Sequence, residues 1–243
     1  MVRVGTAGWN IPKAQAACFP AEGSHLARYA RVLPAVEINT SFYRPHRPAT
    51  YARWAATVPS GFRFAVKVPR DITHDRRLED AEAPLARFLA EVDALGPALG
   101  PLLVQLPPSL RFDPRVAGAF LADLRGRTRA DLVCEPRHPS WFSPEAEALL
   151  HETRIARVAA DPAVVPAAAE PGGWPGLAYW RLHGSPAMYH SAYGRDRLAP
   201  LAERLRTAAA PAWCIFDNTA EGAATADALD LLHRLGTPAR PLR

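Results

Sequence analysis

The sequence contains little lysine and cysteine and no long apolar run. Lys13 and Lys67 are the only lysines among 29 basic residues. A genome rich in G and C produces the same excess of arginine, so composition alone does not indicate a nucleic-acid partner. The three cysteines show no CxxC spacing, and we expect buried, reduced thiols in a cytoplasmic protein. No run of about 18 apolar residues occurs, so we expect no membrane span. The strand-like start also leads us to expect no signal peptide.

Known phosphate-binding and metal-binding motifs are also missing. The first strand-like run contains GTAGWN, which lacks the GxGxxG fingerprint, and no GxxxxGK[ST] motif occurs. Both absences argue against a nucleotide-binding open sheet. There is no HExxH motif and no close His-x-His pair, so we expect neither a metal ion nor another cofactor. The net charge of +5 is not gathered into a run of basic residues, which makes it weak evidence for nucleic acid.

Eight short runs rich in apolar, β-branched and aromatic residues divide the chain. They are Val2–Trp9, Ala35–Phe42, Phe62–Pro69, Leu102–Leu106, Leu132–Pro136, Ile155–Ala160, Leu177–Leu182 and Ala212–Phe216. The spacing of their starts is typical of βα units, which indicates a parallel sheet with right-handed crossovers. Eight such units match a closed barrel. We therefore predict a single (β/α)8 domain over residues 1–243, with an open doubly wound sheet as the alternative.

Capping residues mark helices in most of the gaps between these runs. Three polar residues are placed to cap a helix, two of them directly before a proline: Ser24, Asp113 and Ser143. Helix-period segments also cover 201–209 and 220–235. The gap from 162 to 176 contains too much proline and glycine for a regular helix, so we predict one irregular βα unit there.

Polar side chains gather at the carboxyl ends of the predicted strands, which form the functional face of a barrel. Strand alternation places nine of them inside: Glu37, Asn39, Lys67, Gln105, Glu135, Arg137, Arg181, His183 and Asp217. Their apolar neighbours, such as Val36, Ile38 and Phe42, are expected to face the helices. A loop over 43–48 is expected to form a rim whose arginines and histidine overlook the interior.

Buried charges are costly unless they are paired, so the interior residues serve one another, water or a ligand. The structural alternative is that two ion pairs merely hold the upper barrel together. These are Lys67 with Glu37 on neighbouring strands, and Arg181 with Asp217. Buried ion pairs stabilise poorly compared with apolar packing, which favours a functional role for the whole ring.

Long stretches of the chain resemble the YecE-like family, a bacterial and archaeal domain of unknown function. They are GTAGW, EINTSFYRPHRPATYARWAATVPSGFRFAVKVPRDITH, GPLLVQLPPSL, CEPRHPSWF, YWRLHGSPAMY and FDNTAEGAA. The resemblance spans nearly the whole chain and implies a TIM-type barrel without an established reaction. The family's characteristic residues correspond here to Gly5, Trp9, Glu37, Asn39, Phe42, Tyr43, Lys67, Gln105, Glu135, Arg137, His138, Arg181, His183, Gly184, Asp217 and Asn218. Relatives often carry paired asparagines at the last two positions, so the resemblance does not support a role that needs the Asp217 carboxylate.

The favoured hypothesis is an enzyme or binding protein for a small anionic ligand at the barrel mouth. Arginines bind phosphate or carboxylate groups in forked geometry. Lys67, Glu135 and His183 are the candidate catalytic groups, with the lysine as electrophile, base or Schiff-base former. The candidate ligand-binding residues are Trp9, Glu37, Asn39, Tyr43, Gln105, Arg137, His138, Arg181, Asp217 and Asn218. Trp9, Tyr43 and Trp141 would stack on a ring or sugar face.

Three other functions fit the sequence less well. A divalent-metal isomerase or phosphoesterase could use the carboxylates and His183, but Lys67 and two arginines would oppose a dication. A nucleic-acid-associated protein fits the basic composition, although no recognised motif is present. A glycosidase needs two suitably placed carboxylates, and the strands that commonly carry them hold Gln105 and Arg181 here.

Overall fold

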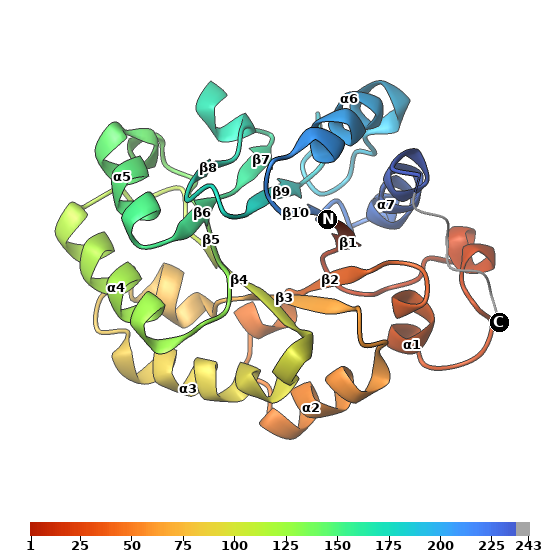
Figure 1. The fold of residues 1–243 in the computed structure, drawn as a ribbon, viewed down its shortest axis with the longest axis horizontal. Helices are drawn as coiled ribbons and strands as arrows, with labels where there is room; N and C mark the ends of the chain where they lie inside the picture. Colours follow the sequence, from red (N-terminus) through yellow and green to blue (C-terminus); the bar gives the residue numbers. More distant parts are fainter. Residues whose placement is uncertain (237–243) are drawn as a thin grey trace.

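The computed structural model describes residues 1–236, which form a barrel of parallel strands surrounded by helices (Figure 1). The last seven residues of the predicted domain, 237–243, lie outside the described part. The strands are β1 Val2–Thr6, β2 Ala35–Ile38, β3 Arg63–Lys67, β4 Leu99–Gln105, β5 Leu132–Glu135, β6 Ile155–Arg157, β7 Ala159–Asp161, β8 Gly172–Gly173, β9 Ala178–Leu182 and β10 Ala212–Phe216. β8 pairs antiparallel to β6 beside the barrel wall, and all other pairings are parallel.

The barrel is closed by two connections between its two sheets. One sheet has the order β1-β10-β9-β7 and the other β2-β3-β4-β5-β6-β8. Ala7 bridges to Glu37, and the Gly8 N–H donates to the Glu37 carbonyl at 2.9 Å, which joins β1 to β2. β6 and β7 are consecutive, and the intervening Val158 N–H donates to the Cys134 carbonyl at 2.8 Å. The (β/α)8 barrel predicted from the sequence is therefore confirmed, and the open sheet is wrong.

Helices cover most of the outside of the barrel. They are α1 His25–Ala30, α2 Pro48–Thr57, α3 Glu82–Val92, α4 Pro114–Arg127, α5 Pro144–Glu152, α6 Gly194–Thr207 and α7 Ala223–Arg234. The predicted caps Ser24, Asp113 and Ser143 all accept a backbone N–H in the first turn. α6 begins seven residues earlier than the predicted 201–209 segment and continues through Pro200. Within residues 1–236, no helix combines the length and apolar character needed to cross a membrane.

The sixth unit is irregular, as the proline and glycine content predicts. Between β7 and β9 the chain forms a short 3-10 turn, Pro166–Ala169, and the strand β8 instead of an α-helix. Arg157 holds this segment through donation to the carbonyls of Ala167 at 3.0 Å and Glu170 at 3.1 Å. The arginine also pairs with Glu147 of α5. Side-chain contacts thus replace the missing helical packing.

The barrel interior changes from apolar to polar along the strand direction. Its lower part contains buried apolar side chains that include Ala35, Ala65, Leu103, Val133, Tyr179 and Ile215. The residues two positions further along these strands are Glu37, Lys67, Gln105, Glu135, Arg181 and Asp217, all buried. Because a strand alternates faces, the same face that packs the lower core presents the polar groups above it.

The cysteines are only partly as expected. Cys134 and Cys214 are buried and free, and burial raises the pKa of both thiols. Cys18 is free but exposed, which corrects the expectation of buried thiols throughout. It lies in a 3-10 turn, Lys13–Cys18, outside the strands that carry the other two.

Candidate functional site

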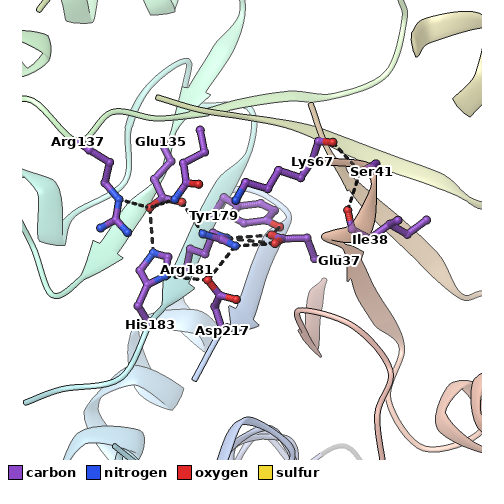
Figure 2. Close-up of polar contacts among 11 residues, drawn as sticks. Glu37, Ile38, Ser41, Lys67, Glu135, Arg137, Tyr179, Arg181, His183 and Asp217 are labelled. Carbon is purple, nitrogen blue, oxygen red and sulfur yellow. Dashed lines mark hydrogen bonds and ion pairs between the residues drawn. The ribbon is translucent and has the colours of Figure 1, made fainter. Parts of the chain in front are cut away.

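Arg181 lies at the centre of the polar layer and is completely buried (Figure 2). Its Nη2 lies 2.7 Å from Glu37 Oε1 and its Nε lies 3.0 Å from Glu37 Oε2, so the two side chains meet in a forked pair. Its Nη1 donates to Glu135 Oε2 at 3.1 Å, and its Nη2 lies 3.0 Å from Asp217 Oδ2. One guanidinium therefore joins three carboxylates from three strands.

His183 links two of the same carboxylates. Its Nε2 lies 2.9 Å from Glu135 Oε1 and its Nδ1 lies 3.0 Å from Asp217 Oδ2. Burial opposes ionisation of Glu135, but the charges of His183, Arg181 and Arg137 outweigh it and lower its pKa well below the ordinary value. The pKa of Asp217 is also lowered, because Arg181 and His183 outweigh its burial. Ionised carboxylates only accept hydrogen bonds, so each nitrogen of the His183 ring faces a hydrogen-bond acceptor.

Three further side chains complete the contacts of the carboxylates. Arg137 Nε lies 3.0 Å from Glu135 Oε1, and the Gln105 amide donates to the same oxygen at 3.4 Å. The Tyr179 hydroxyl donates to Glu37 Oε2 at 3.3 Å. Sequence reasoning missed Tyr179, although its position two residues before Arg181 places it on the same interior face.

Lys67 is the exception within this layer, because no carboxylate oxygen of residues 1–236 lies within 4.0 Å of its Nζ. The ammonium instead lies 4.0 Å from the centre of the Phe42 ring. Burial lowers the pKa of Lys67 to about 8, with a smaller contribution of the same sign from Arg181. Of the two ion pairs in the structural alternative, Arg181 with Asp217 is present at 3.0 Å, whereas Lys67 with Glu37 is absent from residues 1–236.

Two of the three aromatic residues predicted to stack on a ligand, Trp9 and Trp141, lie away from the polar layer. Gly8 has a φ of 84°, which ends the strand alternation, and the ring of Trp9 packs against Trp54 of α2 at 5.0 Å. Trp141 is buried and its Nε1 donates to the Leu110 carbonyl at 3.0 Å, so it is a core residue. Tyr43 is 73% exposed on the rim.

The segment after β2 turns into a short 3-10 helix, Thr40–Phe42, instead of continuing as a strand. This turn brings Phe42 against the Lys67 ammonium, so the prediction that Phe42 faces the helices is wrong. Ser41 donates to the carbonyls of both Ile38 and Lys67, at 3.0 and 2.7 Å, and anchors the turn. Asn39 is half-buried, and its Oδ1 has no hydrogen-bond partner within residues 1–236. His46, predicted to overlook the interior, packs on Trp54 at 5.1 Å.

Two other predicted ligand-binding residues hold loops. His138 Nδ1 accepts the Ser140 N–H at 3.1 Å and caps the turn that follows β5. The Asn218 amide donates to the Ser191 carbonyl at 2.9 Å and to Asp227 at 2.7 Å. It thereby fixes the loop after β9. The same loop carries Tyr189, whose ring contacts His183 edge-to-face at 5.9 Å and which no sequence pattern singled out.

The polar layer joins three carboxylates to basic side chains. Glu37, Glu135 and Asp217 lie within 3.1 Å of nitrogens of Arg137, Arg181 or His183. Lys67 is the basic side chain of this layer that has no carboxylate partner within residues 1–236. Within the described residues, no three His, Cys, Asp or Glu side chains are grouped to hold a metal ion. Arg181 lies among the carboxylates, in the place that a metal ion would need.

The ionised carboxylates predict a stability that falls in acid. The lowered pKa values of Glu135 and Asp217 mean that both contribute stability above their ordinary values of 4.5 and 3.8. This contribution is lost as the pH falls through the lowered values. We expect the urea midpoint to drop steeply below about pH 4, and Glu135→Gln to flatten that dependence while lowering stability at pH 7. An unchanged acid profile in the variant would contradict this assignment of charges.

The chain matches a known protein family over nearly its whole length. Residues 3–242 match the family model described as a protein of unknown function, DUF72. The chain belongs to the DUF72 family. Curated relatives include the UPF0759 protein YecE of Escherichia coli K12, 32% identical over 69% of this chain, and YunF of Bacillus subtilis 168, 27% identical over 59%. These matches confirm the resemblance to the YecE-like family, and they span only 62% and 53% of the two relatives.

Solved structures agree with the barrel assignment. A DUF72 protein from Enterococcus faecalis V583 has a TM-score of 0.81 at 22% identity, covering 100% of this chain and 99% of its own. A DUF72 protein from Thermotoga maritima MSB8 gives 0.78 at 25% identity, covering 97% and 99%. A D-psicose 3-epimerase gives 0.56 at 12% identity, covering 87% and 93%, which reflects the shared fold alone.

Proposed function

We propose that this DUF72 protein binds, and through Lys67 chemically transforms, a small molecule that carries a carboxylate or phosphate group at the barrel mouth. The observation that carries the proposal is the unpaired ammonium of Lys67. Every other charged group of the polar layer has an opposite charge within 3.2 Å. A ligand anion would supply the partner that Lys67 lacks.

Arg137 and Gln105 support the same location. Arg137 uses its Nε for Glu135, and its two terminal nitrogens make no hydrogen bond to residues 1–236. The Gln105 oxygen is likewise without a donor in the described residues. Figure 2 shows Lys67 and Arg137 approaching the polar layer from different sides. A ligand between them would be recognised by one ammonium and one half-used guanidinium.

Burial and the charge of Arg181 would keep a fraction of the Lys67 side chains in the neutral amine form that chemistry needs. A buried amine with a pKa of about 8 is partly neutral near physiological pH, so it can act as a base or attack a carbonyl carbon. Glu135 and His183 already bind each other and Arg181, so a role in proton transfer would need the ligand to displace one of these contacts. Lys67 is therefore the leading candidate catalytic residue.

The two alternative functions receive less support from the geometry. A dication would have to displace Arg181 from its three carboxylates, at the cost of leaving a fully buried guanidinium without partners. The rim loop predicted to contact nucleic acid directs His46 onto Trp54 and Tyr51. Neither arrangement favours a metal-dependent reaction or a nucleic-acid surface at the mouth.

The test compares Lys67→Met with Lys13→Met, since these are the only two lysines and Lys13 is exposed. The proteins are purified under mild conditions, and retained small molecules are identified by mass spectrometry. We expect wild type and Lys13→Met to retain the same carboxylate or phosphate compound. Lys67→Met should retain about tenfold less, the effect of losing a hydrogen bond to a charged group. Equal retention by both variants, or no retained anion in wild type, would refute the proposal.

The same pair of variants separates binding from stability. Folding lowers the pKa of Lys67, so the folded state disfavours its charge, and the residue costs stability below about pH 8. We expect Lys67→Met to raise the free energy of unfolding at pH 7 by up to about 3 kcal/mol, while Lys13→Met leaves it unchanged. Wild type should approach the Lys67→Met variant in stability as the pH rises toward 10. A destabilised Lys67→Met would instead indicate a structural role.

A further inference from the structure

A charged cavity lies at the opposite end of the barrel from the polar layer. It has a volume of about 650 Å³ and is formed by the end of α4, the residues before β5, the end of α5 and the residue after β8. We call it the basal groove and define it by Arg125, Arg127, Arg129, Arg154 and Trp174, with Asp131 and Glu152 at its edge. Its volume is within the range of small-molecule sites.

Two of the four arginines are explained by the helix that carries them. Arg125 and Arg127 lie in the last turn of α4, where positive charge favours the carboxyl end of a helix. Arg125 donates to the Thr128 carbonyl, and Arg127 pairs with Asp123 at 2.6 Å. These contacts are those of ordinary helix ends and do not by themselves indicate a ligand.

The other two arginines have no such explanation. Arg129 and Arg154 lie beyond the ends of α4 and α5, and neither side chain makes a hydrogen bond or ion pair with any residue of 1–236. Both are exposed and both line the groove. Four arginines against Asp131 and Glu152 leave the groove with a positive excess, and burial together with the charge of Arg154 lowers the pKa of Arg125.

The backbone at Arg154 adds an independent observation. Its φ is 54°, in the left-handed region, one residue after the cap of α5. Glycine is the usual residue at this position because a Cβ there is strained. An arginine at such a position carries a local cost, and strain of this kind is characteristic of functional positions.

We propose that the basal groove binds a small molecule that carries two phosphate groups, with Arg129 and Arg154 as its principal ligands. A planar guanidinium matches the oxygens of a phosphate group in forked geometry, and the two arginines precede neighbouring strands, β5 and β6. Trp174 supplies an apolar wall for an uncharged part of the ligand. This site is separate from the barrel mouth and does not depend on the function proposed for it.

The experiment titrates inorganic pyrophosphate into the full chain at low ionic strength, by calorimetry, in a Lys67→Met background that removes the mouth as a competing anion site. We expect binding that weakens about tenfold in Arg129→Gln and again in Arg154→Gln, because each removes a hydrogen bond to a charged group. Arg53→Gln is the matched control, since Arg53 is an exposed arginine of α2 far from the groove residues in the chain. It should bind pyrophosphate as tightly as the background.

Arg154→Gly distinguishes binding from a merely structural role. Glycine relieves the left-handed strain, so the melting temperature should equal or exceed that of the background while pyrophosphate binding weakens about tenfold. Absence of pyrophosphate binding in the background overturns the proposal. Unchanged affinity in Arg129→Gln and Arg154→Gly also overturns it, and so does binding of single-stranded DNA that pyrophosphate fails to displace.

Discussion

Replacing Arg181 by methionine is expected to destabilise the protein by about 3–5 kcal/mol at pH 7, the cost of removing one partner from a buried ionic group. The side chain is completely buried and contacts three carboxylates, which the variant would leave in the interior with fewer partners. Methionine fills a similar space, so lost packing accounts for little of the effect. Urea denaturation followed by circular dichroism would measure it.

The pH dependence of the Arg181→Met variant checks the cause of this loss. Without the guanidinium, the carboxyl groups of Glu135 and Asp217 take up protons at higher pH, which relieves the unpaired charge. The difference in free energy of unfolding between the variant and wild type should therefore become smaller as the pH falls from 7 to 4. Arg197→Met is the control, because its pair with Asp161 is half-exposed and is worth at most about 1 kcal/mol. A loss of similar size in both variants would refute the charge argument.

Gly5→Ala is expected to cause the second-largest loss of stability, because the added Cβ would lie between β1 and β2. A Cβ at Gly5 would fall 2.2 Å from the Ala35 carbonyl oxygen and 2.7 Å from its carbon. Both are backbone atoms, so the two strands would have to separate. Overpacking typically costs about 1–3 kcal/mol, and we expect the upper end because backbone atoms cannot rotate away from the added Cβ as a side chain could.

Gly118→Ala serves as the control for the same chemical change. Gly118 lies in α4, and an added Cβ would meet only Leu149, at 3.9 Å. Alanine favours a helix over glycine by about 1 kcal/mol, so this variant should be slightly more stable than wild type. Thermal melting of both variants measures the contrast. Equal melting temperatures of Gly5→Ala and wild type would contradict the prediction, because they would show that β1 and β2 can separate without loss of stability.

Strand alternation predicted most of the polar layer because the strands are regular up to its level. Glu37, Lys67 and Glu135 each follow an apolar interior residue by two positions on their strands, so the period of two extends to them. The same rule would have found Tyr179. It works here because a closed barrel fixes the inner face of every strand.

The sequence predictions failed where the backbone leaves the regular strand. Gly8 adopts a left-handed conformation and directs Trp9 outward, and a 3-10 turn at 40–42 brings Phe42 over Lys67. The pairing of Lys67 with Glu37 failed because the register pairs Glu37 with Ala65, which leaves the lysine two residues further along. Neither turn geometry nor register is encoded in a hydrophobic pattern.

Contacts across the barrel were also beyond the reach of sequence reasoning. Neighbouring strands suggested Arg181 with Asp217, but the guanidinium also reaches Glu37 and Glu135 from strands that are not its neighbours. Such contacts depend on the barrel diameter and on side-chain rotamers. The basal groove is similar, because it joins the ends of α4 and α5, at Arg127 and Glu152, which are 25 residues apart in the chain.

The ionic contacts of Arg181 connect the two sheets of the barrel, so the candidate site also helps to keep the barrel closed. Glu37, Lys67 and Glu135 belong to one sheet, whereas Arg181 and the strand before Asp217 belong to the other. The ion pairs of Arg181 with Glu37 and Glu135 therefore hold together two sheets that share few backbone hydrogen bonds. A ligand that altered these charges would change how firmly the two sheets are held together, so occupancy of the mouth would be coupled to the rigidity of the barrel.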